Sequence, residues 1–229
     1  MSEPILTPSR RTTMAWMLAA AASPLALAGC AKPDPSGWSD LNLTAITEHR
    51  YGQDPDVMNP QVTWPLTLTQ AQRETVRTAA DMILPADDKS PSAGSLHVDA
   101  FIDEWISAPY EQQQNDRKLI MSGLAWLDDE SQRRNNAKFT ALTDAQRAAI
   151  FDDIAYKDRV KTGYDKPADF FRRLRGLVMA GFYTMPEGIA DIGYIGNTPI
   201  MGRYPGPSRE AKAHLRAKLE ELHLPTDML

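Results

Sequence analysis

Apolar residues recur at helical spacing over most of the chain beyond residue 68. Residues spaced at i, i+3, i+4, i+7 and i+8 lie on one side of an α-helix. One such set is Val98, Phe101, Ile102, Trp105 and Ile106. Proline cannot continue a helix, because it lacks a backbone N–H and its ring clashes with the preceding turn. The pattern therefore predicts an amphipathic helix that begins at Val98 and ends near Pro109.

Two further helices are predicted to begin at the same short motif. LTQAQR at residues 68–73 returns as LTDAQR at residues 142–147. In both copies a Thr precedes a Gln by three residues, which is the capping box that satisfies two free backbone N–H groups at a helix start. A single recurrence is too little for a repeat architecture. We therefore expect only shared capping by Thr69 and Thr143, with the first helix ending at Leu84 before a proline.

Three more helices complete the prediction. Residues 112–129 carry an apolar stripe that is expected to face the core. Pro167 is suited to be the first residue of a further helix, which ends before Pro186 and is expected to be the central one. A last amphipathic helix starts at Ser208 and places Ala211, Leu215, Leu219 and Leu222 on one face. No stretch of strand length alternates apolar and polar residues. The sequence thus predicts an all-α fold, a compact irregular bundle of about six helices within residues 67–229.

Residues 186–207, here called the strap, differ from the rest of the predicted bundle. They are rich in glycine and proline, which predicts a long non-helical loop. They are also unusually apolar for a loop, and clustered apolar residues exposed to water indicate an interaction surface. We expect partner contacts at Ile189, Ile192, Tyr194, Ile195, Asn197, Met201 and Tyr204. The alternative is that the strap packs over its own helices.

The N-terminal region predicts export. Residues 14–28 form a weakly apolar run after Arg10 and Arg11, and this run is shorter than the roughly 20 residues of a membrane-spanning helix. We therefore assign residues 1–29 to a signal peptide that is removed. Residues 30–66 are rich in proline and poor in clustered apolar residues, which predicts an extended tether between the cleavage site and the bundle.

Two finer features of the signal are resemblances. The sequence LAGC, ending at Cys30, resembles the bacterial lipobox, which implies a diacylglycerol on that cysteine and a membrane-anchored periplasmic lipoprotein. Plain cleavage that leaves Cys30 as a free thiol is the alternative. SRRTTM resembles the twin-arginine export motif, with Arg10 and Arg11 as its arginine pair, although Thr13 stands where Phe is usual. Export by the general secretion route is the alternative here.

Composition and motifs exclude several functions. The formal charge is 25 − 30 = −5, and no block of Lys or Arg provides a nucleic-acid surface. The sequence contains no dinucleotide, P-loop, serine-hydrolase or covalent-haem signature. The four histidines lie far apart, and the adjacent acidic pairs and triplets, including Asp128–Glu130, are expected to be solvated helix ends. We therefore expect no catalytic residue, no metal ligand and no cofactor ligand in this chain.

Two stretches carry a family resemblance. ADMILPADDKSPSAGSLHVDAFIDEWIS begins at residue 80, and FFRRLRGLVMAGFYTMPEGIADIGYIGNTP begins at residue 170. They resemble the gluconate 2-dehydrogenase subunit 3 family, the small subunit of bacterial membrane-associated, FAD-dependent sugar dehydrogenases. The similarity covers residues 68–207. ILPAD, FIDEW and the GFYT…GYIGNTP ending are specific in combination, and none of them is a catalytic motif.

The resemblance implies a partner that does the chemistry. In this family the large subunit is a flavin-bearing oxidoreductase of the glucose–methanol–choline type, often joined by a c-type cytochrome that carries haem c. FAD would then lie in the partner, and the small subunit would carry the export signal and escort it. A gluconate 2-dehydrogenase and a glucoside 3-dehydrogenase fit equally well. The alternative function is an independent helical envelope lipoprotein that binds a small ligand or another protein.

Overall fold

The computed structural model describes residues 34–48, 50, 51, 56, 58, 61–194, 196 and 201–226. Within these residues the chain is all-helical, with seven α-helices, two short 3-10 helices and no strand. The predicted all-α class is confirmed. The chain divides into two compact units, residues 1–192 and residues 193–229. Each unit is described separately below.

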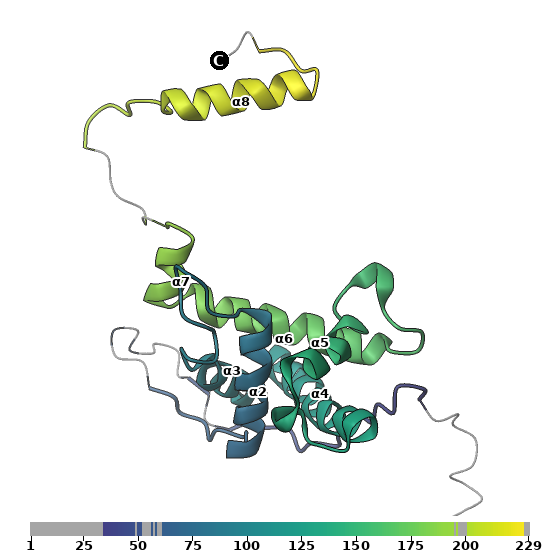
Figure 1. Cartoon of the computed structure of the whole chain (residues 1–229). Helices are drawn as coiled ribbons and strands as arrows, with labels where there is room; N and C mark the ends of the chain where they lie inside the picture. Colours follow the sequence, from purple (N-terminus) through teal and green to yellow (C-terminus); the bar gives the residue numbers. More distant parts are fainter. Residues whose placement is uncertain are drawn as a thin grey trace, which may run out of the picture. The chain divides into compact units, whose positions relative to one another are not determined.

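Among its described residues, the first unit contains six α-helices and both 3-10 helices (Figure 1). Helix α3 contacts α2, α4 and α6, and α4 also contacts α6, so these four helices form the centre of the packing. In chain order the elements are α2 (Gln70–Ile83), α3 (Val98–Ser107), α4 (Glu111–Asn135), η1 (Phe139–Ala141), α5 (Asp144–Asp152), η2 (Lys157–Arg159), α6 (Asp165–Tyr183) and α7 (Pro186–Asp191).

Both predicted capping boxes are present. The Thr69 hydroxyl accepts a hydrogen bond from the Gln72 backbone N–H, and the Gln72 side chain accepts one from the Thr69 N–H in return. Thr143 and Gln146 make the same pair of bonds at the start of α5. The shared motif therefore caps both helices in the same way, because each Thr–Gln pair satisfies two backbone N–H groups that have no partner at a helix start.

Two helix boundaries differ from the prediction. Helix α4 continues six residues past Asp129 to Asn135 and ends where Asn136 takes a left-handed conformation with φ of 53°. Asp128–Glu130 is therefore not a solvated helix end, and the buried position of Glu130 explains why the helix continues. Helix α6 begins at Asp165, so Pro167 is its third residue. A proline is still tolerated there, because the N–H groups of the first turn have no partner within the helix.

The core lies where α6 crosses α4 and α3. Phe170, Leu174 and Val178 are fully buried along one side of α6. Gly123 of α4 faces Phe170, and a Cβ atom at position 123 would overlap the ring. The absence of a side chain at Gly123 therefore lets the two helices approach closely. Helix α6 contacts α2, α3, α4 and α7, which agrees with the central place that its apolar stripe predicts.

The leader is packed against the helices over residues 34–48. This segment contains no helix, as expected, but it does not run free as a tether. Trp38 is 8% exposed and belongs to the core cluster. The Trp126 indole N–H donates to the Ser36 carbonyl, at 2.8 Å, and the Leu41 N–H donates to the Ser122 hydroxyl, at 3.0 Å. The leader thus forms part of the body from residue 34 onward.

The strap begins as a helix, which corrects the prediction that residues 186–207 are non-helical. Pro186 is the first residue of α7, where its fixed φ favours a helix start. Gly188 is buried against Phe182 at the end of α6, and an added Cβ would overlap the Phe182 carbonyl. The first third of the strap is therefore held on the body. The second unit contains one helix, α8 (Arg209–Glu221), as predicted from Ser208 onward.

Candidate functional site

The predicted export and lipid-attachment residues lie outside the described residues. This applies to Arg10, Arg11 and Cys30, and also to Ile195 and Asn197 of the strap. Their assignments therefore stay predictions. Five of the seven proposed partner contacts can be located: Ile189, Ile192, Tyr194, Met201 and Tyr204.

Four of those five contacts are exposed. Ile192 is 58% exposed and Tyr194 57%, whereas Met201 and Tyr204 reach 92% and 64%. Ile189 is only half-buried within α7, where its backbone N–H donates to the Met185 carbonyl. Ile189 and Ile192 belong to the first unit, and the other three belong to the second. Each unit therefore presents apolar side chains of the strap to solvent.

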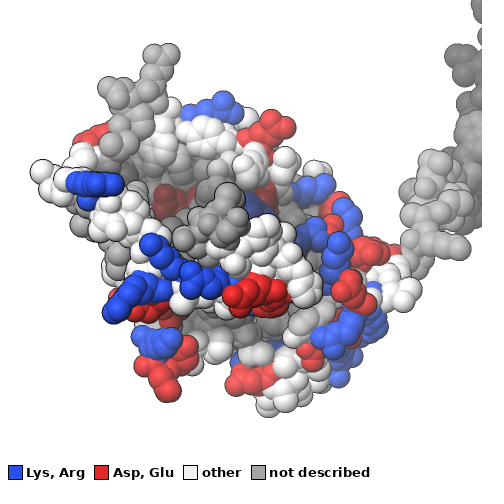
Figure 2. Space-filling model, turned by 90° about the horizontal axis from the view of Figure 1, so that it is seen from above, with Lys and Arg blue, Asp and Glu red and all other residues white. Residues whose placement is uncertain are grey.

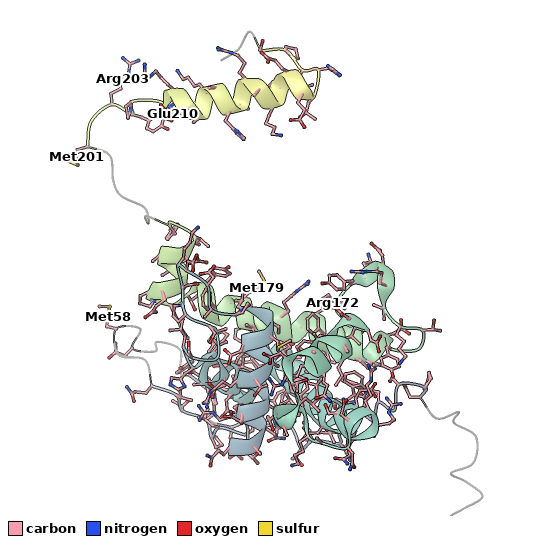
Figure 3. All side chains as sticks on the ribbon, viewed as in Figure 1. Met58, Arg172, Met179, Met201, Arg203 and Glu210 are labelled. Carbon is pink, nitrogen blue, oxygen red and sulfur yellow. The ribbon has the colours of Figure 1, made fainter. Side chains whose placement is uncertain are left out.

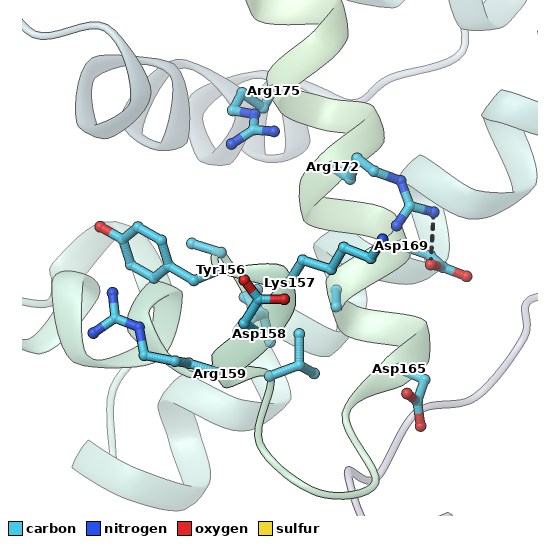
Figure 4. A pocket seen from close by; sticks show the side chains of 12 residues that line it. Tyr156, Lys157, Asp158, Arg159, Asp165, Asp169, Arg172 and Arg175 are labelled. Carbon is cyan, nitrogen blue, oxygen red and sulfur yellow. Dashed lines mark hydrogen bonds and ion pairs between the residues drawn. The ribbon is translucent and has the colours of Figure 1, made fainter.

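A basic groove lies between η2 and the first half of α6. It encloses about 710 Å³ and has Ile154, Ala155, Val160 and Ala168 among its lining residues. Its charged side chains come from both elements, and Figure 4 shows the Lys157 side chain extending from η2 toward α6, where Arg172 pairs with Asp169. They are Lys157, Asp158, Arg159, Asp165, Asp169, Arg172 and Arg175.

The cations of this groove are only partly neutralised. Arg172 pairs with Asp169 at 2.8 Å, and the Arg159 guanidinium lies over the Tyr156 ring at 4.3 Å from its centre. Within the described residues, Lys157 and Arg175 have no ion pair or hydrogen bond from their side chains. The groove therefore offers two unpaired cations beside an apolar lining, which is suited to an acidic surface or a small anion.

Buried charges hold the turn that carries this groove. Glu130 of α4 is 1% exposed and contacts Arg133 and Arg134, three and four residues further on. Arg134 also reaches Asp153 at 2.5 Å, and Tyr164 donates to Glu130 at 3.1 Å. This network connects α4 with the residues on both sides of η2. Its role is structural, because every member is bonded to another and none faces an open cavity.

Asp153 has a lowered pKa within this network. Partial burial raises the pKa of the carboxyl, but the hydrogen bond and charge of Arg134, with Lys161, outweigh burial and hold the pKa below its ordinary value. The Lys161 ammonium lies 3.4 Å from Asp153, and the Lys161 backbone N–H donates to the Asp153 carbonyl at 2.8 Å. Asp153 therefore stays ionised and fastens the loop after α5.

An aromatic hollow that the sequence does not predict lies on the first unit. It encloses about 220 Å³ between the leader and the end of α3. Trp64 makes edge contacts with Tyr51 and Tyr110, at 4.9 and 6.1 Å between ring centres. Glu104 and Gln113 provide the polar side chains of the lining. No sequence pattern indicates this hollow, because its aromatic residues come from three separate segments: 51–64, 101–105 and 110.

No group of three or more His, Cys, Asp or Glu that could hold a metal ion occurs among the described residues. His97 caps α3 in a left-handed conformation, and its ring nitrogen lies 3.8 Å from Asp99.

Basic and acidic side chains are interspersed over the face drawn in Figure 2. None of the described helices is both long and apolar enough to cross a bilayer.

Comparison with known proteins gives one match. A family model described as "Gluconate 2-dehydrogenase subunit 3" matches residues 70–206. The match covers more than half of the chain and includes α2 to α7 together with nearly the whole strap, whereas α8 lies outside it. The searches of curated proteins and of solved structures gave no match.

Proposed function

The chain belongs to the gluconate 2-dehydrogenase subunit 3 family, and from that premise we propose that it is the non-catalytic small subunit of a periplasmic, FAD-dependent sugar or alcohol dehydrogenase. The FAD belongs to a large subunit of the glucose–methanol–choline type, and a c-type cytochrome with haem c serves as a third component. This chain escorts the flavin subunit and docks it.

The observation that carries the docking proposal is the exposed strap. Ile192 and Tyr194 follow directly on α7, which Gly188 holds against α6, and both are more than half exposed. Large apolar side chains next to an ordered helix can bind to a partner protein with little further loss of conformational entropy. Tyr and Met are also enriched in protein interfaces. The family match includes this segment, which supports a role shared with other small subunits.

Export and anchoring form the other half of the proposal. A twin-arginine signal moves folded cargo, so a small subunit that carries Arg10 and Arg11 can bring a folded, FAD-loaded partner across the membrane. A diacylglycerol on Cys30 supplies two acyl chains, which together anchor a protein firmly, whereas one chain binds only marginally. Replacing Cys30 by Ser is expected to prevent the incorporation of a labelled fatty acid into the chain.

Co-purification with the flavin subunit tests the docking. A tagged small subunit is co-expressed with a flavin oxidoreductase encoded beside it, and bound flavin and dye reduction are measured in the purified complex. Ile192→Ser with Tyr194→Ser is expected to reduce recovery of the flavin subunit at least tenfold with an unchanged melting temperature. Leu66→Ser, which changes an apolar side chain that is 51% exposed elsewhere, is the matched control. Dye reduction by the isolated small subunit would contradict the proposal.

A second candidate function rests on the aromatic hollow. Tyr51, Trp64 and Tyr110, with Glu104 at the edge, could receive a small ligand, as expected of an independent envelope lipoprotein. The hollow is smaller than the 300–1,000 Å³ that is usual for ligand pockets. Recovery of the chain from native membranes without any flavin protein, together with saturable quenching of tryptophan fluorescence by a ligand, would favour this function over the escort role.

A further inference from the structure

Both ends of helix α8 (Arg209–Glu221) are capped by the residues directly next to the helix. The Ser208 hydroxyl accepts from the Ala211 N–H at 3.1 Å, which is an N-cap. At the other end His223 takes a left-handed conformation with φ of 55°. Its N–H donates to the Glu220 carbonyl, and the Leu224 N–H donates to the Leu219 carbonyl. These two bonds form a Schellman motif, so both ends of α8 are stabilised locally.

The helix carries an apolar face that no described residue of its own unit covers. α8 has no buried residue. Leu215 is 46% exposed, Leu222 64% and Leu224 50%, and Leu219 is the most covered of the four. The Schellman turn brings Leu224 back toward Leu219, because a contact between these two positions commonly accompanies the motif. Four leucines therefore gather on one side of a short, preformed helix.

Two of the four basic residues of α8 flank this face. At 100° per residue, Lys212 and Lys218 lie about 60° from the centre of the leucine sector, one on each side, whereas Arg216 and Arg209 lie about 90° and about 115° away. The three glutamates of the helix all lie more than about 110° away, and one of them, Glu221, pairs with Lys218 at 2.6 Å. Figure 3 draws the side chains of the helix, with Glu210 labelled near its start. α8 carries four basic and three acidic residues, so its charge is 4 − 3 = +1, within a chain whose charge is −5.

We propose that α8 lies on the surface of a membrane that contains anionic lipid, with its leucines inserted at the boundary between headgroups and acyl chains. A lysine at the edge of an apolar face can bury its methylene stem and extend its ammonium to a lipid phosphate. On binding, Lys218 exchanges its pair with Glu221 for a lipid phosphate, and the glutamates of the far face stay in water. The place of Lys212 and Lys218 beside the leucines, more than the net charge, favours an anionic lipid surface as the occupant of the leucine face.

Two further observations favour a lipid surface over a protein. The family match ends at residue 206, so α8 lies outside the region shared with other small subunits, which includes the proposed docking strap. With two leucines among its thirteen residues, and Leu222 and Leu224 directly after them, α8 is also too short to form a stable coiled coil with a second copy by itself. The proposal depends neither on Cys30 nor on the flavin partner, and it supplies a second membrane contact in addition to the proposed lipid.

Vesicle flotation tests this with residues 30–229 in which Cys30 is replaced by Ser, so that no acyl chain contributes. Vesicles of phosphatidylethanolamine with phosphatidylglycerol are compared with vesicles of pure phosphatidylcholine. We expect binding to the anionic vesicles that falls at least tenfold in Leu215→Gln with Leu219→Gln. Ala213→Gln with Ala217→Gln, on the polar face of the same helix, is the matched control and should bind as the parent does. Lys212→Gln with Lys218→Gln should remove the preference for phosphatidylglycerol.

Four outcomes would overturn the proposal. The first two are a parent chain that does not float with anionic vesicles and a leucine variant that floats as well as the alanine control. The third is a changed oligomeric state of the leucine variant, measured by light scattering, which would assign the face to a second copy. If the leucine variant loses the co-purified flavin subunit while vesicle binding is unchanged, the face belongs to that partner. Failure of the parent to recover any flavin subunit would contradict the proposed function alone.

Discussion

Arg134 connects the end of α4 with the loop after α5. Its guanidinium contacts Glu130, four residues earlier in the same helix, and Asp153, nineteen residues further on. It also donates to the Ala149 carbonyl at 3.3 Å. A guanidinium can serve several acceptors at once because its five N–H groups are fixed in one plane. One side chain thereby holds the segment that presents Lys157 and Arg159 to the basic groove.

We predict that Asp153→Asn lowers the free energy of unfolding by about 0.5–1 kcal/mol at pH 7, since Asp153 is partly exposed and its ion pairs are screened. The folded-state pKa is lowered, so the stabilisation is present above the unfolded-state pKa near 4 and is lost as pH falls through the folded-state pKa. Urea titrations at pH 7 and pH 2.5 measure this. The difference between wild type and variant should shrink toward zero at pH 2.5.

Asp152→Asn is the control for this prediction. Asp152 is the exposed neighbour of Asp153 and makes no side-chain bond with the described residues. Its replacement should change the free energy of unfolding by less than about 0.5 kcal/mol at both pH values. A difference between wild type and Asp153→Asn that persists at pH 2.5 would show that the loop is held by some interaction other than the carboxylate charge.

Burial of charged residues could not be predicted from the sequence. Glu130 belongs to a run of three acids, which favours a solvated helix end, yet it is 1% exposed. Asp116 was not singled out at all, and it accepts two bonds from Arg173 and one from the Trp105 indole at 2.8 Å. The basic partner of Asp116, Arg173, is 57 residues away in sequence, and only the folded chain brings the two together. Glu130 has its arginines on its own helix, but the Tyr164 hydroxyl that also bonds to it comes from another segment. Residue type alone does not reveal such a pair.

At the scale of elements, the crossing of α4 and α6 depends on a glycine. Gly123 packs directly on the Phe170 ring, whereas Gly176, on the exposed side of α6, has no atom near the position of a Cβ. Glycine in a helix interior costs about 1 kcal/mol relative to alanine. At Gly123 this cost is offset by the close approach of two helices, and at Gly176 no such contact compensates for it.

We therefore predict opposite effects of the same substitution at the two glycines. Gly176→Ala should raise the free energy of unfolding by about 0.5–1 kcal/mol, because only helix propensity changes. Gly123→Ala should lower it by about 1–2 kcal/mol, since the overlap with Phe170 exceeds the gain in propensity. Urea denaturation followed by circular dichroism measures both. A stabilised Gly123→Ala variant would mean that the Phe170 ring can move aside at little cost.

Helix starts were predicted better than helix ends. Thr69 and Thr143 signal a start through a local motif of four residues, and the structure places both N-caps there. The end of α4 depends on the tertiary burial of Glu130, and α7 forms because Gly188 can pack on the end of α6. The glycine content of the strap predicts a loop, and for this reason the sequence does not indicate the helix at its start. Neither feature can be recognised without knowing the neighbouring helix.

At the scale of the whole molecule, the leader changes the definition of the folded body. Proline-rich composition predicted an extended tether up to residue 66, and composition describes the backbone conformation correctly over residues 34–48. Composition does not reveal that an isolated aromatic residue of the leader packs into the core of the bundle. Trp38 lies 6.3 Å from Phe170 between ring centres, and Ser36 accepts from Trp126. The aromatic hollow at Tyr51 and Trp64 escaped prediction for the same reason.

This packing yields a prediction. It distinguishes a leader that is part of the folded domain from a leader that only connects the domain to the N-terminus. Trp38→Ala should lower the free energy of unfolding by about 3–5 kcal/mol, as expected for a buried tryptophan in a core. For a domain of this size that loss corresponds to a melting temperature lower by roughly 10 °C. Met58→Ala removes a side chain of the same leader that is 90% exposed, and it should leave the melting temperature unchanged. If both variants melt like the wild type, the leader is only a tether, and the bundle from residue 67 onward folds without it.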